Sequence, residues 1–419
     1  MEPDVSRTDA SKSDVSKCRI CAGEVRKFFD FGTQPLSDAF LTEREKDQAF
    51  HFRLAVGLCT GCTMVQLLEE VPRERMFHHD YPYHSSGSRH MREHFAQTAH
   101  DLLATELTGP DPFCVEIGSN DGVMLGVIKD AGVRHLGVEP SGGVAELARK
   151  DGVRVRTDFF EESTARLIAA EDGPADVVYA ANTICHIPYL DSILRGVDVL
   201  LRPGGVFVFE DPYLGDIAER NTFDQIYDEH FYLFTARSVR GVARRFGFEL
   251  VDVRRLPVHG GEVRYTLARR GEREVSPAVP ALIAEEAGRG LAELETLEKL
   301  GNGIDRICAD LVALLEDLRR QGRSVAGYGA TAKSATVTNY AGIGPELLPC
   351  VYDTTPAKIG RLMPGSGIPI RAAGEFSRPY PDYAVLFAWN HTDEILAREA
   401  EFAARGGKWI VYVPEVRVL

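Results

Sequence analysis

The sequence predicts an α/β protein in which a small cysteine-rich domain precedes two Rossmann-like domains. Three observations predict this fold class. Two Cys-x-x-Cys pairs lie near the start of the chain. From residue 113 onward, short apolar strands alternate with helical segments, which is typical of a parallel sheet. A glycine-rich loop joins a strand to a helix twice, after residue 117 and after residue 326.

We expect three domains, because a chain of 419 residues is too long for one typical core. The N-terminal domain is placed at residues 1–75 and the first α/β domain at 76–275. A helical connector and the second α/β domain follow at 276–419. In the connector, leucine and isoleucine recur at helical spacing, and we predict two helices interrupted at Gly301-Asn302-Gly303.

Composition and charge limit the partners. The formal net charge of −14 leaves no basic surplus to neutralise phosphates, so we expect no nucleic-acid partner. Residues 1–17 are polar and lack the apolar core of a signal peptide. No stretch approaches the ~18 consecutive apolar residues of a membrane helix. We therefore expect a cytoplasmic protein without a membrane partner, and a monomer is compatible with the sequence.

The cysteine pairs predict a structural zinc site. Residues 22–58 separate the two pairs, and glycines at 23 and 61 help each pair to present both sulfurs from one turn. Two thiolate pairs complete a closed tetrahedral S₄ shell, which suits Zn²⁺ and leaves no open coordination position. A closed site stabilises a fold and takes no part in catalysis. The predicted ligands are Cys18, Cys21, Cys59 and Cys62.

The first glycine loop is predicted to bind a cofactor. The strand 113–117 runs into Gly118-Ser119-Asn120-Asp121-Gly122 and then into a helix. Glycines permit a sharp turn and let a ligand approach the amides at the helix start, and asparagine tolerates a positive φ. Further candidates follow the ends of neighbouring strands or lie in the stretch of this domain that precedes its first strand. The predicted cofactor-binding residues are Tyr81, Ser88, Glu116, Gly118, Asn120, Asp121, Gly122, Glu139, Pro140, Asp158, Phe159 and Asn182.

The residue types around this loop favour S-adenosyl-L-methionine over NAD. A dinucleotide site requires G-x-G-x-x-G, whereas here Glu116 leads the loop and Asn120 replaces the middle glycine. An acid suits the methionine ammonium and would repel a pyrophosphate. Glu139 is placed to accept the ribose hydroxyls, and Asp158 with Phe159 to receive the adenine. The first α/β domain is therefore predicted to be a class I S-adenosylmethionine-dependent methyltransferase domain.

The second loop, Gly327-Tyr328-Gly329-Ala330-Thr331-Ala332, is the main argument for another function. With Asp353 at the end of the next strand, it nearly matches the dinucleotide fingerprint G-x-G-x-x-A. An NAD(P)-dependent sugar-nucleotide oxidoreductase or epimerase is the alternative that this loop leaves open. Amides at the helix start, with Lys333 and Arg361, would meet phosphates in either case. A third alternative is a zinc-containing adaptor that retains the fold without catalysis.

Several motifs together resemble the deoxysugar C-methyltransferases of antibiotic biosynthesis. The resemblance covers nearly the whole chain after residue 17 and is closest to enzymes that methylate C3 of dTDP-3-amino-4-keto-2,3,6-trideoxy sugars. The motifs are the cysteine pairs, Tyr81-x-Tyr83-x-Ser85-Ser86, Glu116-Ile117-Gly118-Ser119-Asn120-Asp121-Gly122, Leu201-Arg202-Pro203-Gly204-Gly205, Tyr227-Asp228-Glu229-His230, His259-Gly260-Gly261 and Trp389-Asn390-His391.

The resemblance implies that His230 removes the C3 proton, with Tyr227, Glu229 and His186 in the same pocket. A carbon beside a ketone becomes a nucleophile once a base removes its proton, and histidine is the natural base near neutral pH. In a helix Tyr227 and His230 would share a face and Glu229 would point elsewhere, whereas in a loop all three could converge. The resemblance also implies that the C-terminal domain holds the sugar nucleotide. The predicted substrate-binding residues are Tyr213, His259, Gly260, Gly329, Thr331, Lys333, Asp353, Arg361 and Asn390.

Overall fold

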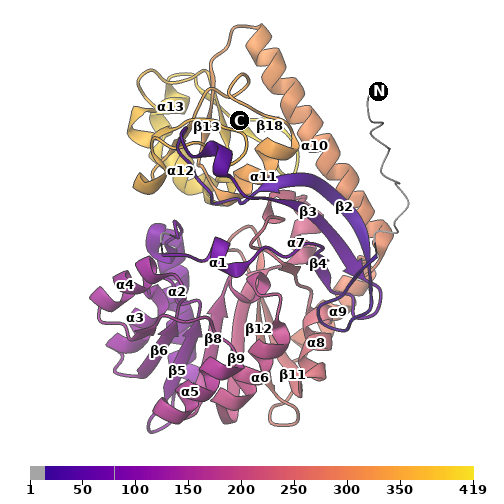
Figure 1. Ribbon diagram of the computed structural model, residues 1–419, viewed down its shortest axis with the longest axis vertical. Coiled ribbons are helices and arrows are strands. Elements are labelled where there is room, and N and C mark those ends of the chain that lie inside the picture. Colours follow the sequence, from indigo (N-terminus) through magenta and orange to yellow (C-terminus); the bar gives the residue numbers. More distant parts are fainter. Residues whose placement is uncertain (1–14, 80) are drawn as a thin grey trace, which may run out of the picture.

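The computed structural model describes residues 15–79 and 81–419 and contains three sheets. The part of the polar stretch 1–17 that precedes residue 15 lies outside the described residues, and so does the expectation about a signal peptide there. An antiparallel sheet comes first, and two α/β sheets follow it along the chain. Figure 1 places the central α/β domain below, the C-terminal one above, and the long N-terminal strands beside the junction between them.

The N-terminal sheet has the strand order β1-β2-β3-β4-β10, and all its pairs are antiparallel. Its last strand comes from the middle of the chain, so this sheet is built jointly by the N-terminal residues and the central domain. The strands are β1 (Val15–Lys17), β2 (Glu24–Pro35), β3 (His51–Cys59), β4 (Val65–Leu67) and β10 (Tyr232–Leu233).

The central sheet has seven strands in the order β11-β12-β9-β8-β5-β6-β7. Strand β12 runs in the opposite direction to the other six strands, which are parallel to one another. The order reverses at β5, whose two neighbours are β6 and β8, and ligands bind at such a switch point. The strands are β5 (Phe113–Ile117), β6 (Arg134–Val138), β7 (Val155–Arg156), β8 (Ala175–Ala181), β9 (Leu201–Pro212), β11 (Phe248–Leu256) and β12 (Glu262–Arg269).

Helices cover both faces of the central sheet, as its alternating side chains require. Val177 and Tyr179 of β8 pack with one helix layer, and Val178 and Ala180 pack with the other. The first layer contains α2 (Arg89–Thr105), α3 (Val123–Asp130) and α4 (Gly142–Lys150), and the second contains α5 (Glu162–Asp172), α6 (Leu190–Leu200) and α8 (Ala236–Arg245). The short helices α1 (Arg73–Met76) and α7 (Leu214–Arg220) lie in connections.

The C-terminal sheet has the order β15-β14-β13-β16-β17-β18, which is the doubly wound order with β13 at the switch point. Its first five strands in this order are parallel and β18 is antiparallel. The strands are β13 (Val325–Tyr328), β14 (Val351–Asp353), β15 (Ile370–Ala372), β16 (Tyr383–Leu386), β17 (Lys408–Val411) and β18 (Arg417–Val418). The helices are α11 (Ala332–Tyr340), α12 (Thr392–Arg398) and α13 (Ala400–Ala404).

The connector differs from the prediction in where its two helices separate. They are α9 (Ala278–Gly288) and α10 (Leu294–Arg320), and α10 runs unbroken through residues 301–303. The glycines there serve close packing: a Cβ at Gly301 would lie 2.7 Å from Phe29 Cδ2, and one at Gly303 would lie 2.0 Å from Asn221 Nδ2. The predicted interruption at Gly301-Asn302-Gly303 was therefore wrong, because packing energy overrides a weak local propensity.

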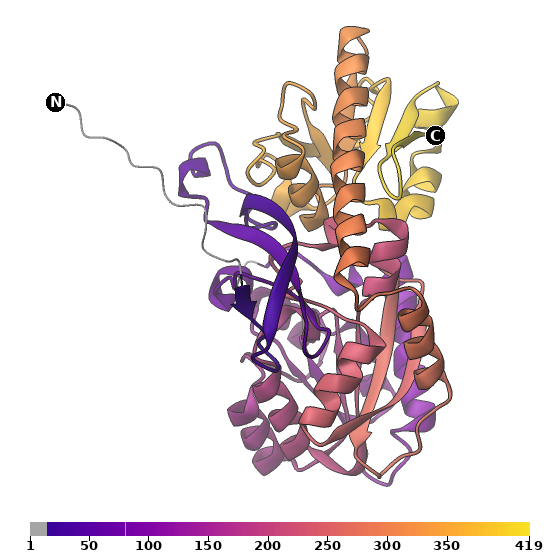
Figure 2. The ribbon, with the colours of Figure 1, turned by 90° about the vertical axis from the view of Figure 1, so that its right-hand side faces the viewer.

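Helix α10 and strand β2 join the two α/β domains. Figures 1 and 2 show α10 running beside both of them, and β2 contacts both α10 and α11. The backbone amide of Leu362 donates to the Leu41 carbonyl at 2.8 Å, which ties the C-terminal domain to the N-terminal one. The N-terminal domain thus contacts both the central and the C-terminal α/β domains.

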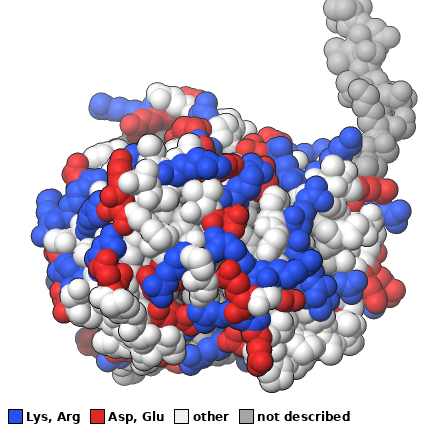
Figure 3. Space-filling model, turned by 90° about the horizontal axis from the view of Figure 1, so that it is seen from below, with Lys and Arg blue, Asp and Glu red and all other residues white. Residues whose placement is uncertain are grey.

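Among the described residues, no helix is long and apolar enough to cross a membrane. The face drawn in Figure 3 mixes basic and acidic side chains over its whole area. Exposed ion pairs such as Lys299–Glu295 reflect the same mixing. That face therefore carries no broad patch of a single charge.

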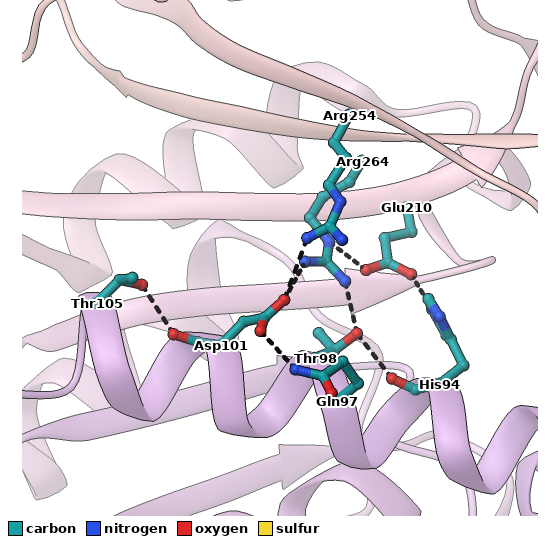
Figure 4. Close-up of polar contacts among 8 residues, drawn as sticks. All are labelled: His94, Gln97, Thr98, Asp101, Thr105, Glu210, Arg254 and Arg264. Carbon is teal, nitrogen blue, oxygen red and sulfur yellow. Dashed lines mark hydrogen bonds and ion pairs between the residues drawn. The ribbon is translucent and has the colours of Figure 1, made fainter.

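A buried charge network holds α2 against the central sheet (Figure 4). The Glu210 carboxylate, fully buried on β9, accepts from Arg264 Nε at 2.6 Å and lies 2.6 Å from His94 Nε2 on α2. Arg264 also donates to Thr98 Oγ1 at 2.6 Å. Asp101 of α2 lies 3.5 Å from Arg264 and 3.3 Å from Arg254. Helix α2 is thereby fixed to the central sheet.

We expect Arg264→Met to lower the free energy of unfolding by about 3–5 kcal/mol, because it removes the guanidinium that pairs with the fully buried Glu210 carboxylate. Urea unfolding followed by circular dichroism measures this. The control is Lys299→Met, which removes a pair whose side chains are 70% and 78% exposed. That change is expected to stay within about 0.5 kcal/mol. Equal effects of the two variants would contradict the assignment.

Candidate active site

The four predicted zinc ligands converge at one end of the N-terminal sheet. Their sulfur atoms all lie within 4.8 Å of one another, with Cys18 and Cys62 at 3.5 Å and Cys21 and Cys59 at 3.4 Å. Backbone amides point at the sulfurs, including that of Ile20 to Cys18 Sγ at 3.3 Å. The hydrogen bond between Cys18 and Cys62 lowers the pKa of Cys18 to about 5. Four thiols in this geometry form the closed S₄ donor set that fits Zn²⁺.

A cofactor pocket lies at the switch point of the central sheet, beside the ends of β5, β6 and β8. Of the predicted residues, seven line it: Tyr81, Gly118, Asn120, Glu139, Pro140, Phe159 and Asn182. Its walls combine an acid and a glycine turn with aromatic and aliphatic side chains. This donor set fits S-adenosylmethionine, which needs polar partners for ribose and methionine and an apolar slot for adenine.

The first glycine loop has the backbone that its residue types predict. Gly118, Asn120 and Gly122 have φ values of 69°, 49° and 77°, all in the left-handed region. A Cβ at Gly118 would lie 2.3 Å from Thr183 Oγ1, so only glycine fits between the two loops. Gly122 ends the loop as the N-cap of α3, where a Cβ would press on Ala148 and Val153. The loop is thus shaped both by backbone conformation and by close packing.

We expect Gly118→Ala to weaken binding of S-adenosylhomocysteine at least tenfold and to destabilise the fold by about 1–3 kcal/mol. Both the positive φ and the approach to Thr183 resist a side chain. Calorimetry and thermal unfolding measure the two effects. The matched control is Gly126→Ala inside α3, where an added Cβ meets no atom within 4 Å. The control is expected to gain about 0.5–1 kcal/mol and to bind normally.

Segment 81–88 is anchored to the glycine loop by two polar side chains. Asn120 Oδ1 accepts from the Ser85 amide at 3.0 Å, and its Nδ2 donates to the Tyr83 carbonyl at 3.2 Å. Asp121 accepts from the Ser86 amide at 3.1 Å and from its hydroxyl at 2.7 Å. These two residues therefore hold a cover on the pocket, and Asp121 itself is not among the lining residues.

Ser88 ends the segment as the N-cap of α2, accepting from the Met91 amide at 3.1 Å, and it faces the second cleft. A direct contact of Ser88 with the cofactor stays a prediction.

The predicted acids around the cofactor are placed unequally. Glu139 lines the pocket and accepts from the amides of Asn120 at 2.9 Å and Ser141 at 2.7 Å. Glu116 is buried, its Oε2 has no hydrogen-bond partner among the described residues, and burial raises its pKa well above the usual value. Asp158 pairs with Arg156 at 2.6 Å and is not among the lining residues. The adenine acceptor role of Asp158 stays a prediction that its position does not favour.

Sequence reasoning missed the residues that close the apolar end of the pocket. The Arg73 guanidinium lies 4.1 Å from the Phe159 ring centroid and donates to Glu161 at 2.5 Å and to the Tyr189 hydroxyl at 2.6 Å. Phe77 stacks on His186 with ring centroids 5.7 Å apart. Arg73 and Phe77 come from the segment after the N-terminal sheet, and no local pattern marks them. The pairing of Arg73 with aromatic residues more than 80 positions away is visible only in the fold.

The segment 223–230 begins with a short 3₁₀ turn (Phe223–Gln225) and continues as a loop, in which the three predicted catalytic residues converge. The Tyr227 hydroxyl lies 2.9 Å from His230 Nε2, and the Gln225 carbonyl lies 2.7 Å from His230 Nδ1. A carbonyl can only accept, so Nδ1 carries the proton and Nε2 is the basic nitrogen, which accepts from Tyr227. The Glu229 carboxyl accepts from the Tyr81 hydroxyl at 3.1 Å. The loop alternative, in which Glu229 converges with Tyr227 and His230, is therefore the one observed.

Burial controls the charge of these groups. It lowers the pKa of His230 well below the usual value, helped by His186 and Lys333, so His230 is neutral near pH 7. Burial also lowers the pKa of His186 to about 3, and the two rings stack with centroids 5.3 Å apart. Burial raises the pKa of Glu229 well above the usual value, and the carboxyls of Asp38 and Asp228 add to this. The loop therefore offers an uncharged base beside uncharged hydroxyls.

A cleft of about 820 Å³ lies between His79, residues 81–91, α4 and the second glycine loop. Gly329, Thr331 and Asp353 line it, as predicted residues of the second loop. The Asp353 oxygens are already engaged by the amides of Ala330 and Thr355, both at 2.7 Å. Two cations that the sequence did not single out, Lys358 and Arg398, also line this cleft.

The other predicted substrate residues fall into two groups. Arg361 donates to the Phe40 carbonyl at 3.0 Å and so anchors the N-terminal domain, and it is not among the cleft-lining residues. Tyr213 is fully buried and donates to Glu286 at 3.2 Å. The second group lies at the junction between the two α/β domains and consists of His259, Gly260, Lys333 and Asn390. A Cβ at Gly260 would meet the Trp389 ring at 2.3 Å, and Lys333 Nζ lies 5.6 Å from the centroid of that ring. Asn390 follows Trp389 in the same 3₁₀ turn.

Three family models match the chain one after another. Residues 18–77 match a zinc binding domain, residues 88–253 match a methyltransferase domain, and residues 257–414 match a C-methyltransferase C-terminal domain. Arg73 and Phe77, at the apolar end of the pocket, fall within the first match, and residues 81–87 lie between the first two matches.

Among curated proteins, the chain is 34% identical over 409 residues to the C-methyltransferase NovU of Streptomyces niveus, covering 97% of each chain. It is 26% identical over 215 residues to a sarcosine/dimethylglycine N-methyltransferase of Halorhodospira halochloris, covering 47% of this chain and 69% of that one. A solved structure of an S-adenosylmethionine-dependent methyltransferase from Anabaena variabilis matches with a TM-score of 0.33 and 19% identity, over 41% of this chain and 84% of that one.

Proposed function

The chain belongs to the family of S-adenosylmethionine-dependent C-methyltransferases with a zinc-binding domain, and on this premise we propose that it methylates C3 of a dTDP-linked 4-keto-deoxysugar. A 3-amino-2,3,6-trideoxy sugar of antibiotic biosynthesis is the proposed acceptor. A ketone next to the reacting carbon makes the C–H acidic enough for a histidine to remove its proton. The reaction then requires a base, a donor for the enolate oxygen and a methyl source.

The observation that carries this proposal is the buried Tyr227–His230 pair between the cofactor pocket and the second cleft. His186, which lines the cofactor pocket, stacks on His230. Tyr81 lines both the pocket and the cleft, and its hydroxyl bonds to Glu229. A base held where two binding sites meet can act on a carbon presented from one site while the other holds the methyl donor.

In this proposal His230 Nε2 is the base and receives the C3 proton, either directly or through the Tyr227 hydroxyl that it already binds. The Gln225 carbonyl holds the Nδ1 proton and so keeps Nε2 basic. A second hydroxyl, that of Tyr81 or Tyr227, would donate to the enolate oxygen. Bound S-adenosylmethionine supplies an electrophilic methyl group to the resulting carbon nucleophile.

The second glycine loop is proposed to hold the diphosphate of the sugar nucleotide. The Thr331 hydroxyl caps α11, and Lys358 and Arg398 add positive charge to the same cleft. The alternative, NAD at this loop, would use Asp353 for the ribose hydroxyls. The Asp353 oxygens accept from the Ala330 and Thr355 amides, just as the Glu139 oxygens accept from amides in the first loop, and each keeps a second lone pair, so binding measurements with both ligands decide between them.

The test is a mass-spectrometric assay of methyl transfer from S-adenosylmethionine to a panel of dTDP-4-keto-deoxysugars with a 3-amino or a 3-hydroxyl group. We expect a mass gain of one methyl group on a 4-keto sugar and none on the matching 4-hydroxy sugar. Calorimetry with S-adenosylhomocysteine and with NADH is the companion measurement. Saturable NADH binding, without methylation of any sugar nucleotide, would contradict the proposal.

A further inference from the structure

Glu262 is a buried carboxyl on β12 that makes no well-formed hydrogen bond within the described part of the chain. It is the first residue of β12 and pairs in register with Pro212 at the end of β9. The preceding His259, Gly260 and Gly261 all have positive φ values, 48°, 92° and 121°, and this sharp turn directs the chain back into the sheet. Glu262 is 0% exposed, and neither carboxyl oxygen has a hydrogen-bond partner among the described residues.

Other buried carboxyls nearby differ from Glu262 in their partners. Glu210 is paired with both His94 and Arg264. Asp211 accepts from the Cys185 amide at 3.1 Å. Glu286, equally buried, accepts from the Tyr213 hydroxyl and from the Ala236 and Arg237 amides. Burial of a polar group without a partner destabilises a fold, so such a group is expected to have a partner in the working complex.

The surroundings of Glu262 place it where the two binding sites meet. Burial raises its pKa well above the usual value, and the neighbouring Glu210 and Asp211 carboxyls add to this. The Asn182 side chain, a weak donor that does not reach full hydrogen-bond geometry, and the charge of Lys333 oppose it. Asn182 lines the cofactor pocket and Lys333 lies at the start of α11 in the C-terminal domain. Burial raises the pKa of Tyr83, which lines both the pocket and the cleft, and the Glu262 carboxyl adds to this.

We propose that Glu262 is a substrate-specificity residue whose carboxyl accepts a hydrogen bond from a hydroxyl or ammonium substituent on the sugar ring beside the reacting carbon. This inference rests on the proposed sugar-nucleotide function. Glu262 lines neither the cofactor pocket nor the second cleft of the ligand-free protein. The sugar is the favoured ligand because Glu262 follows the turn 259–261, where a Cβ at Gly260 would meet Trp389 of the C-terminal domain, and because the charge of Lys333 from that domain acts on it. A sugar substituent would supply the donor that Glu262 lacks among the described residues.

The test compares the wild-type protein with Glu262→Leu and Glu262→Gln. Leucine keeps the size of the side chain and removes its hydrogen bonds, whereas glutamine restores an acceptor. We expect Glu262→Leu to raise the KM for the dTDP-4-keto sugar at least tenfold, with kcat changed less, and Glu262→Gln to recover part of that loss. Affinity for S-adenosylhomocysteine, measured by calorimetry, is expected to stay within twofold in both variants.

Thermal unfolding of the ligand-free protein gives a second, independent readout. Because neither Glu262 oxygen has a hydrogen-bond partner in the described part of the ligand-free protein, Glu262→Leu is expected to melt at or above the temperature of the wild type. The matched control is Glu286→Leu, which removes an equally buried carboxyl with three hydrogen bonds and is expected to melt at a lower temperature.

Four outcomes would overturn the inference. An unchanged KM with a lowered melting temperature assigns Glu262 a structural role. A loss of S-adenosylhomocysteine affinity with an unchanged sugar KM assigns it to the cofactor. Failure of the wild type to methylate any sugar nucleotide removes the proposed function and this inference with it, whereas an active wild type with wild-type-like variants removes only the inference.

Discussion

Replacing His230 with asparagine is expected to slow methyl transfer by about 10²–10⁴-fold, the usual contribution of a general base. Asparagine can still accept from Tyr227 and donate to the Gln225 carbonyl, the two groups that His230 contacts at 2.9 and 2.7 Å. It has no titratable nitrogen, so the C3 proton loses its acceptor. S-adenosylhomocysteine affinity is expected to remain, because His230 is not among the lining residues of the cofactor pocket.

Proton exchange separates the base from the methyl-transfer step. With S-adenosylhomocysteine in place of the donor, the wild type is expected to exchange the C3 hydrogen of the sugar with deuterium from solvent, and His230→Asn is expected to lose this exchange. The control is His51→Asn, an exposed histidine of β3. Methylation at the wild-type rate by His230→Asn would rule out His230 as the base.

The pH dependence of the wild type follows from the same geometry. Burial holds the pKa of His230 well below its usual value of 6.5. The neutral imidazole is the active form, and a lowered pKa keeps it neutral to more acidic pH. We therefore expect kcat to be constant above pH 6.5 and to fall only at lower pH, as Nε2 becomes protonated.

Loss of the zinc site is expected to be the largest change in stability. Binding of structural zinc contributes about 10–16 kcal/mol in small zinc domains, which matches or exceeds the ~5–15 kcal/mol that stabilises a whole typical domain. In the doubly substituted variant Cys18→Ser/Cys59→Ser, each sulfur pair keeps one thiol, too few to close the S₄ shell. Elemental analysis is expected to give about one zinc per wild-type chain and none in this variant.

The same variant is expected to lose methylation, although zinc takes no part in the chemistry. The N-terminal domain holds both sides of the loop that carries His230. The Ser37 amide donates to Asp228 at 3.0 Å, the Leu67 amide donates to the Phe231 carbonyl at 2.8 Å, and β10 pairs with β4. The control is Cys308→Ala, a single buried thiol of α10, which is expected to keep both zinc and activity. A folded, active protein without zinc would refute the structural assignment.

Local chemistry explains why much of the protein was predictable from its residues. The two Cys-x-x-Cys pairs carry their geometry in their spacing, and their four sulfurs converge as predicted. Asn120 was expected to adopt a positive φ because its residue type tolerates it, and its φ is 49°. The S-adenosylmethionine-dependent methyltransferase assignment, drawn from the acid-led glycine loop and the family resemblance, is confirmed by the comparisons.

Other features were decided only by contacts between residues far apart in the sequence. The glycines at 301 and 303 were expected to break a helix, yet they make room for Phe29 and Asn221 and leave α10 continuous. Arg361 was expected to bind phosphate, yet it donates to the Phe40 carbonyl, and Lys358 lines the cleft instead. The contact that places Arg73 over Phe159 likewise has no local signature.

By itself, the sequence determined the fold class, the cysteine cluster and the cofactor class, because each leaves a recognisable pattern of residue types along the chain. Only the tertiary structure decided that the zinc domain holds the loop of His230 and that Glu262 lacks a hydrogen-bond partner among the residues that the structure describes. The physical reason is that the state of a buried polar group depends on every element packed around it. That surrounding set is defined only when the whole chain is folded.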